Sequence, residues 1–342
     1  MCDKVHKVIK KISSLWKTKT IKTSSLVFKI ATIYTVFMLL FLMLIIGWTQ
    51  LFGESASCIK SSGKVWYDDI KYECWIKNDR KFVSFGIFRV VVMLLFHASI
   101  FIIPGKIWYK QKKKTISKAL KKLPTSSFNQ DWITQRNQLI DFITNNPKAH
   151  HRLFAIKYIS CELLTVFSII LNMLYTCLFI HDFWNEYQQA ATSFLFLDYS
   201  QFYSESSRIF PRQVTCNYSS YSFEPFTVTK EEVACTFPHN DLKAVIFAII
   251  YIWYIFILTW AVLHLFLMIV LYICKCLRLR LIRRMLGRPA TVCECKHLSE
   301  NGDIGLWFLL RIFRRNMHLA HFQDLCTGLL ADPILNAYFF LA

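Results

Sequence analysis

The sequence predicts an all-α membrane protein with four transmembrane helices, a cytoplasmic helical domain and two small, disulfide-stapled extracellular loops. Of the 342 residues, 54% are hydrophobic, which exceeds the roughly 45–50% that is usual in soluble domains. The apolar residues are concentrated in four segments, and each is long enough to cross a bilayer, for which about 20 residues are needed. The two loops expected outside the membrane hold two cysteines each.

These four spans divide the chain into nine predicted regions. A further apolar run at 306–313 is too short to cross a bilayer and is expected to form an amphipathic cytosolic helix. The regions are a cytoplasmic N-terminal helix at 1–29, transmembrane helix 1 at 30–48, extracellular loop 1 at 49–81, transmembrane helix 2 at 82–103, a cytoplasmic helical loop at 104–153, transmembrane helix 3 at 154–180, extracellular loop 2 at 181–243, transmembrane helix 4 at 244–273, and a cytoplasmic C-terminal helical segment at 274–342.

The placement of lysine and arginine predicts the orientation. Residues 1–29 hold eight lysines and one acid, residues 104–152 hold eleven basic and two acidic residues, and residues 274–342 hold ten and five. The loop at 49–82 holds six basic and five acidic residues, and the loop at 181–243 holds four and eight. Because basic loops stay in the cytoplasm, a multi-pass membrane protein with both termini and the middle loop in the cytoplasm is predicted. The net charge of +19 is explained by this orientation and by attraction to anionic lipid, so nucleic-acid binding is not expected.

The loop cysteines are Cys58 and Cys74 in the first loop and Cys216 and Cys235 in the second. Cysteines on the oxidising side of a membrane can form disulfides. Four cysteines allow three pairings, and their spacing does not choose among them. Pairing between the loops would fix the outer ends of all four spans together, whereas pairing within each loop would not.

The first fifteen residues repeat apolar side chains at helical spacing, with lysines on the other faces. Two placements fit this pattern: a basic helix on the inner leaflet, or a helix folded into the cytoplasmic mouth of a pore. Lys4, Lys7 and Lys11 are the pore-lining candidates of the second placement. A ring of such lysines around a lumen would favour anions.

Three other residues are candidate site residues. Asn217 begins the chain's single N-glycosylation sequon, directly after Cys216 on the predicted outer face. Arg89 and Glu162 are charged groups at membrane depth, where such groups are costly and often functional. Arg89 is near the outer end of its span and can reach the interface. Glu162 lies deeper, so we expect it to pair with a neighbouring helix or to face water.

The sequence contains no motif typical of catalysis. A P-loop, H-E-x-x-H, G-x-S-x-G and G-x-G-x-x-G are all absent, so an enzyme is not expected. The C-x-C pairs at 274–276 and 293–295 are spaced more closely than zinc thiolates, so neither a metal site nor a cofactor is expected. A channel subunit with a stapled outer rim and a non-conducting membrane adaptor are the classes that remain.

Five short motifs, spread over nearly the whole chain, keep a characteristic order and spacing. They are Ser25-Leu26-Val27-Phe28-Lys29, similar to S-I-V-F-R; Cys74-Trp75-Ile76, similar to C-W-I; Tyr158 to Leu164, similar to Y-x-x-C-E-L-L; Phe210-Pro211-Arg212 with Cys216, similar to F-P-R-x-x-x-C; and Gly302-Asp303 with Trp307 to Leu310, similar to G-D-W-F-L-L. In this order they resemble the innexins, the gap-junction proteins of invertebrates. Residues 86–90 read G-I-F-R-V where the family has Y-Y-Q-W-V, so the chain resembles a divergent member. A divergent animal gene and a viral innexin (vinnexin) both fit this departure.

The resemblance implies a ring of subunits, eight being the usual family number, around a wide pore for ions and small metabolites. Two rings docked through their outer loops would form a gap junction. The N-terminal helix would lie in the pore, and the loops would be joined by Cys58–Cys235 and Cys74–Cys216. A glycan on Asn217 would block docking and leave a single-membrane hemichannel.

The expected partners follow from the same resemblance. They are further copies of this chain, other innexins in a hetero-oligomer, the apposed hemichannel of a neighbouring cell, and the lipid bilayer. The alternatives are a non-conducting membrane adaptor and a regulatory subunit that co-assembles with other innexins.

Overall fold

The structure is a computed structural model of the chain, and it describes residues 22–52, 57–60, 63–64, 87–115, 132–144, 148–180, 182–222, 227–287 and 304–331. These residues belong to two compact units. Unit 1 contains the chain up to Phe28, Pro104–Leu163 and the chain from Leu263 onward. Unit 2 contains Lys29–Ile103 and Leu164–Val262. Each unit is built from segments that are far apart in the sequence.

Four helical segments in the described part of the chain are long and apolar enough to cross a membrane, as predicted. They are Leu26–Thr49, Arg89–Lys113, His150–Phe179 and His239–Ile273. The helices that contain them are α2 (Leu26–Lys29), a π-helical turn η1 (Ile30–Tyr34), α3 (Thr35–Phe52), α5 (Ile87–Thr115), α8 (Lys148–Phe179) and α12 (His239–Ile273).

The second helix extends beyond the predicted end of its span. The sequence places the end at 103, directly before a proline, but α5 continues through Pro104 to Thr115. A proline in a helix removes one backbone hydrogen bond. In membrane helices the freed backbone groups can be satisfied by neighbouring groups, so a proline does not have to end the helix.

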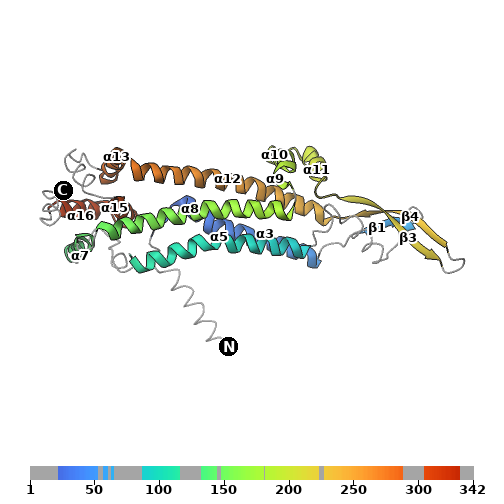
Figure 1. Cartoon of the computed structure of the whole chain (residues 1–342), viewed down its shortest axis with the longest axis horizontal. Helices are drawn as coiled ribbons and strands as arrows, with labels where there is room; N and C mark the ends of the chain where they lie inside the picture. Colours follow the sequence, from blue (N-terminus) through green and yellow to red (C-terminus); the bar gives the residue numbers. More distant parts are fainter. Residues whose placement is uncertain are drawn as a thin grey trace, which may run out of the picture. The chain divides into compact units, whose positions relative to one another are not determined.

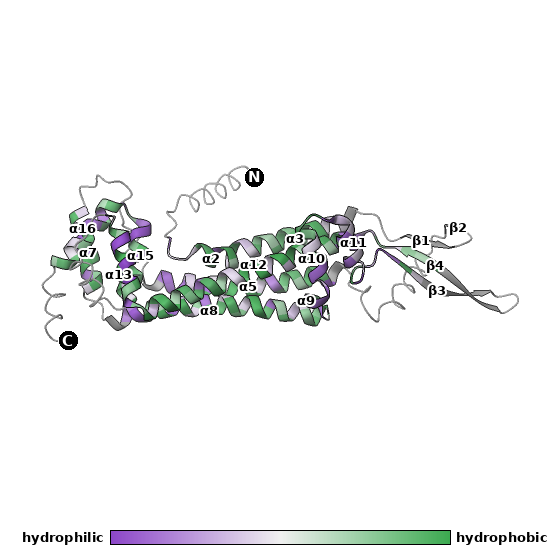
Figure 2. Cartoon of the chain, turned by 90° about the horizontal axis from the view of Figure 1, so that it is seen from above, coloured by the Kyte–Doolittle hydropathy of each residue, from purple (hydrophilic) through white to green (hydrophobic). Residues whose placement is uncertain are grey.

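In unit 2, the segments of α3, α5, α8 and α12 run side by side (Figures 1 and 2). Buried polar groups link these segments inside the apolar core. Tyr254 Oη on α12 lies 2.8 Å from His97 Nδ1 on α5, and Asn172 Nδ2 on α8 donates to the His97 carbonyl at 3.5 Å. Trp253 Nε1 donates to Thr35 Oγ1 at 2.9 Å, and Thr35 Oγ1 donates to the Ile30 carbonyl within the π-helical turn. His97 therefore connects α5 to α8 and α12 through hydrogen bonds of its carbonyl oxygen and its ring Nδ1.

A four-stranded sheet in unit 2 joins the two predicted outer loops. Its strands are β1 (Ser57–Lys60), β2 (Gly63–Lys64), β3 (Gln213–Ser222) and β4 (Thr227–Thr236), in the order β2-β1-β4-β3. All neighbouring strands are antiparallel, and β1 from the first loop pairs with β4 from the second. The strand pairing therefore ties the loops to each other through backbone hydrogen bonds.

The second loop also contains three short helices that the sequence analysis did not predict. They are α9 (Phe183–Glu186), α10 (Gln188–Leu195) and α11 (Tyr199–Ser206). Asp198 caps α11 by accepting from the Gln201 backbone N–H at 3.1 Å, and this bond lowers the pKa of Asp198. Tyr187 donates to the Ala244 carbonyl at 2.5 Å, and its burial raises the pKa of its hydroxyl. This bond fixes the helices to the start of α12.

Unit 1 has its own hydrophobic core. The helices α7 (Trp132–Thr144), α13 (Lys275–Leu286), α15 (Ile304–Asn316) and α16 (Leu319–Ala331) gather there with the unit 1 segments of α5, α8 and α12 (Figure 1). The run at 306–313 lies in a helix, α15, as predicted, and its apolar side chains are buried in this core. Phe308 packs against Trp108, Phe154 and Tyr158 at ring-centroid distances of 5.0–6.4 Å.

A close approach between α15 and α8 within unit 1 requires a glycine. A Cβ atom on Gly305 would lie 2.3 Å from the carbonyl carbon of His151 and 2.4 Å from the backbone nitrogen of Arg152. Both neighbours are backbone atoms, so neither can move without a shift of the helix. Gly328 on α16 differs, because its Cβ would meet the terminal Cδ1 of Ile140, at 2.7 Å.

We expect Gly305→Ala to lower the stability of the folded protein by roughly 1–3 kcal/mol, the usual cost of overpacking. The gain in helix propensity, about 1 kcal/mol, opposes only part of this loss. Thermal unfolding of the detergent-solubilised protein, followed by size-exclusion chromatography, measures the effect. Gly328→Ala is the matched control and should lose less, because the Ile140 side chain can rotate away. Equal midpoints for the two variants would contradict the close approach.

Candidate functional site

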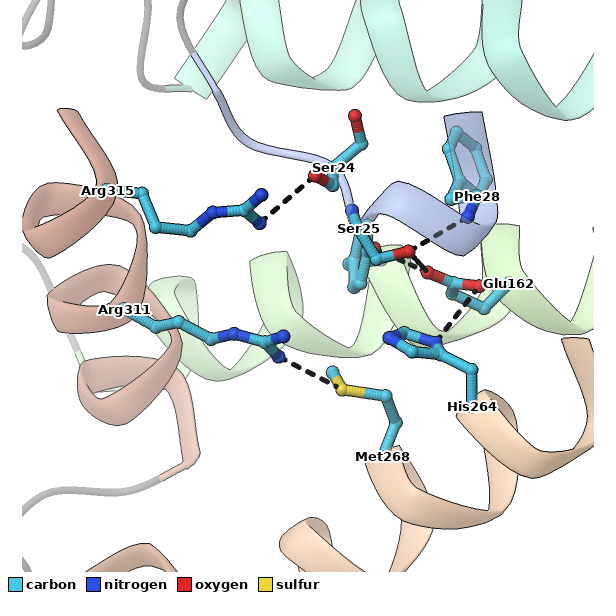
Figure 3. A network of polar contacts seen from close by, with 9 residues as sticks. Ser24, Ser25, Phe28, Glu162, His264, Met268, Arg311 and Arg315 are labelled. Atoms are coloured by element: carbon cyan, nitrogen blue, oxygen red, sulfur yellow. Dashed lines mark hydrogen bonds and ion pairs between the residues drawn. The ribbon is translucent and has the colours of Figure 1, made fainter. Parts of the chain in front are cut away.

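A buried carboxyl group on α8 is the centre of a polar network in unit 1, shown in Figure 3. Glu162 is 2% exposed, and its Oε1 accepts a hydrogen bond from Ser25 Oγ at 3.0 Å. The same oxygen accepts a short hydrogen bond from Tyr158 Oη, one helical turn earlier on α8. His264 Nδ1 on α12 lies 3.5 Å from the other oxygen, Oε2. The carboxyl group therefore joins α8 to the start of the first span and to α12.

Ser25 is held by three hydrogen bonds. Its backbone N–H donates to Tyr158 Oη at 2.9 Å, and its Oγ accepts from the backbone N–H of Phe28 at 3.0 Å while donating to Glu162. The bond from Phe28 makes Ser25 the N-cap of α2, and serine is among the best residues at that position. One side chain thus starts the first span and attaches it to α8.

Helix α15 holds the segment that precedes Ser25. Arg315 Nη1 donates to the Ser24 carbonyl at 3.1 Å (Figure 3). Asn316 accepts from the Lys22 backbone N–H at 2.7 Å and donates to the Lys22 carbonyl at 3.0 Å. Residues 22–25 are therefore fixed by hydrogen bonds from two helices, α8 and α15.

A cationic side chain of α15, Arg311, interacts electrostatically with Glu162. Arg311 on α15 donates to Met268 Sδ at 3.3 Å, and its guanidinium group lies 5.5 Å from the centre of the Trp307 ring. Burial lowers the pKa of Arg311, while the nearby Tyr158 and Glu162 act in the opposite direction. A buried carboxylate is tolerated when it is hydrogen-bonded and has cations nearby. We call Ser25, Tyr158, Glu162, His264, Arg311 and Arg315 the Glu162 network.

This arrangement can hold backbone segments in place. Among the described residues, no group of three or more His, Cys, Asp or Glu side chains could hold a metal ion. The hydroxyl donors face the carboxyl group and one another. We therefore interpret the Glu162 network as an anchor for the residues that precede the first span.

The predicted site residues have different outcomes. Glu162 accepts a hydrogen bond from Ser25, and Arg89 is exposed near the start of α5. Lys4, Lys7, Lys11 and Cys74 lie outside the described residues. For Cys58, Cys216 and Asn217 only the backbone is described, in strands β1 and β3.

Two loop cysteines face each other in the sheet. The strand register pairs the Cα atoms of Cys58 and Cys235 across β1 and β4, and Cys235 is buried. In the same sheet Cys216 is paired with Val233, and Asn217 with Glu232.

The sequence analysis did not identify Ser25, Tyr158 and Arg315 as site residues. A signal for two of them was present, because Ser25 begins one motif of the resemblance and Tyr158 begins another. The structure brings these motifs together, and Phe308 of a third motif packs on Tyr158 at a ring-centroid distance of 5.0 Å. Three motifs separated in the sequence thus form one site.

We expect Ser25→Ala and Glu162→Gln to be coupled in their effects on stability. Either change weakens the same hydrogen bond, and a bond to a charged group contributes about 1.5–3 kcal/mol. The double variant should therefore lose less than the sum of the two single losses in thermal unfolding. Ser24→Ala is the matched control, because Ser24 contributes its carbonyl oxygen to the bond with Arg315. Additive losses would contradict the shared bond.

Comparison with known proteins agrees with these motifs. The sequence profile of the innexin family matches residues 24–84 and 89–332, and its one interruption falls in the segment where the Y-Y-Q-W-V signature is missing. Innexin inx4 of Anopheles gambiae is 25% identical over 91% of this chain and 87% of its own length. Innexin shaking-B of Drosophila melanogaster is 22% identical over 94% of this chain and 93% of its own length. Innexin inx1 of Drosophila melanogaster is 24% identical, covering 94% and 96%. The chain belongs to the innexin family, as a divergent member.

Proposed function

We propose that the chain is a subunit of a large-pore oligomeric channel that passes ions and small metabolites as a gap junction, a hemichannel or both. The observation that carries this proposal is the family match over 24–84 and 89–332, together with four candidate spans. The proposed assembly is a ring of eight subunits in the plasma membrane, made of this chain alone or with other innexins. Docking of two rings from neighbouring cells would complete the intercellular channel.

The proposed topology has both termini and the middle loop in the cytoplasm. The excess of basic residues at 1–29, 104–152 and 274–342 supports this orientation. Residues 49–81 and 181–243 would then lie outside the cell, where cysteines oxidise.

The proposed disulfides are Cys58–Cys235 and Cys74–Cys216. Residues that face each other across antiparallel strands have Cα atoms about 4.5–5.5 Å apart, and disulfides usually need about 4.4–6.8 Å. The opposed positions of Cys58 and Cys235 support the first pair. The second pair is the one that the likeness to the innexins implies for Cys74 and Cys216. Together with the β1–β4 pairing, these bonds would make the outer loops a rigid rim.

The Glu162 network suggests how the N-terminal residues act in such a channel. Residues 22–25 connect Lys4, Lys7 and Lys11 to the first span, and they are fixed to α8 and α15. A fixed connection would hold the N-terminal helix at the cytoplasmic mouth of the pore. There, lysines repeated around the ring would favour anions.

A second candidate function is a regulatory subunit that co-assembles with other innexins, or a non-conducting adaptor. The observation that favours it is the lost signature at 86–90, at the interruption of the family match. Such a subunit would alter the coupling formed by other innexins without conducting alone.

The test of the proposed function is an electrical recording from paired cells that express this protein in the absence of other gap-junction proteins. We expect current between the cells, current across the membrane of each cell, or both. Cells with an empty vector are the control, and labelling with a membrane-impermeant biotin reagent confirms that the protein reaches the surface. Silence in both recordings, with the protein at the surface, would contradict a channel and favour the second candidate.

The variant Asn217→Gln distinguishes the docked from the undocked form in the same recordings. A glycan at this position in β3 would hinder contact between apposed loops, and its removal should raise the current between cells. Enzymatic deglycosylation of the wild-type protein shows whether the sequon is used. If it is, removal of the glycan increases the electrophoretic mobility of the protein. An unchanged current after removal of a confirmed glycan would contradict this steric effect.

A further inference from the structure

A basic pocket lies in unit 1 beside the segment that precedes the first span. Its volume is about 630 Å³, and it is open to the surface. Four cationic residues line it: Lys22 from that segment, Arg284 from α13, and Arg314 and Arg315 from α15. The remaining lining is apolar and consists of Leu281, Met285 and Met317. Among the residues that the structure describes, no acidic side chain lines the pocket.

The cations around this pocket are positioned but not neutralised by the described residues. Arg314 Nε donates to the Met285 carbonyl at 3.2 Å, and Arg315 Nη1 donates to the Ser24 carbonyl at 3.1 Å. These acceptors are neutral backbone groups, so they orient the guanidinium groups without cancelling their charge. None of the four cations has a carboxylate within ion-pair distance among the residues that the structure describes. Such a cluster concentrates positive potential that an anion can satisfy.

The pocket is next to the ends of two spans. Lys22 precedes Leu26, the first residue of the first span, by four positions, and α13 begins at Lys275, two positions after α12 ends at Ile273. If all four candidate spans cross the bilayer, these two ends are on the same side of it. Figure 2 shows hydrophilic positions along α13 directly after the apolar α12. The pocket therefore lies where a lipid headgroup and the start of its acyl chains would be found.

We propose that this pocket binds the phosphorylated headgroup of an anionic membrane lipid. Arginine is well suited to phosphate, because its planar guanidinium group donates several hydrogen bonds in a fixed geometry. Four cations match a headgroup with more than one phosphate, and basic pockets beside membrane helices on the cytoplasmic side bind such headgroups. Leu281, Met285 and Met317 would contact the apolar part of the lipid.

The consequence concerns the N-terminal segment. A headgroup in the pocket would contact Lys22 and α13 and α15 at once, so it would add to the hydrogen bonds that already hold residues 22–25. The lipid would thereby stabilise the anchored position of the N-terminal residues. This inference rests on the proposed topology, but binding itself does not depend on conduction.

The experiment measures binding to the purified full-length protein in detergent. The probes are short-chain phosphatidylinositol 4,5-bisphosphate, the matching phosphatidylserine and phosphatidylcholine, and the soluble inositol 1,4,5-trisphosphate. We expect the bisphosphate lipid to bind tighter than phosphatidylserine, with no binding of phosphatidylcholine. Arg284→Gln should weaken binding about tenfold, the effect of one lost charge-assisted contact.

Arg283→Gln is the matched control. Arg283 is an exposed neighbour of Arg284 on the same helix and is not among the residues that line the pocket. Its replacement by glutamine removes the same charge. Its affinity should equal that of the wild type. Arg284 is exposed and makes no hydrogen bond to another described residue, so its replacement leaves the fold intact.

Three results would overturn the inference. Equal weakening by Arg284→Gln and Arg283→Gln would mean that only overall charge matters. Equal affinity for phosphatidylserine and the bisphosphate lipid would also mean that only overall charge matters. Equal affinity for inositol 1,4,5-trisphosphate and the lipid would assign the pocket to a soluble phosphate anion instead. Each of these results is independent of whether the protein conducts.

Discussion

The hydrogen bond from Ser25 to Glu162 is the interaction on which the start of the first span depends. A carboxyl group that is almost completely buried has to find donors inside the protein, because water cannot supply them. Its donors come from α8 itself and from the residue that caps α2. The cost of leaving this group unsatisfied therefore keeps residues 22–25 against α8, and Arg315 and Asn316 hold the same residues from α15.

This anchor gives a physical role to Ser25 and Tyr158, which the sequence analysis recognised only as parts of motifs. In a channel of this family, the residues before the first span would have to reach the pore while the helices around them remain fixed. Hydrogen bonds to backbone atoms of Lys22, Ser24 and Ser25 are suited to that task, because they constrain the path of the chain. The basic pocket beside them offers a second constraint, which would depend on the lipid that is present.

The sequence was sufficient to predict the helical class and the four spans, because apolar length is a local property. It also indicated that Glu162 needs a partner. It could not identify Ser25 as that partner, since 137 positions separate the two residues and only the fold brings them together. The helices at 183–206 and the β1–β4 pairing were missed for related reasons: short elements have weak periodicity, and strand pairing between loops depends on long-range contacts.

Hydrogen bonds hold residues 22–28 in place, and hydrogen exchange at their backbone amides tests this anchor most directly. In the structure the amides of Lys22, Ser25 and Phe28 donate to Asn316, Tyr158 and Ser25, respectively. Mass spectrometry of a peptide covering these residues, in the detergent-solubilised protein, should find slow exchange at these amides. Exchange at the rate of an unstructured peptide would contradict the anchor and, with it, the proposed positioning of the N-terminal helix.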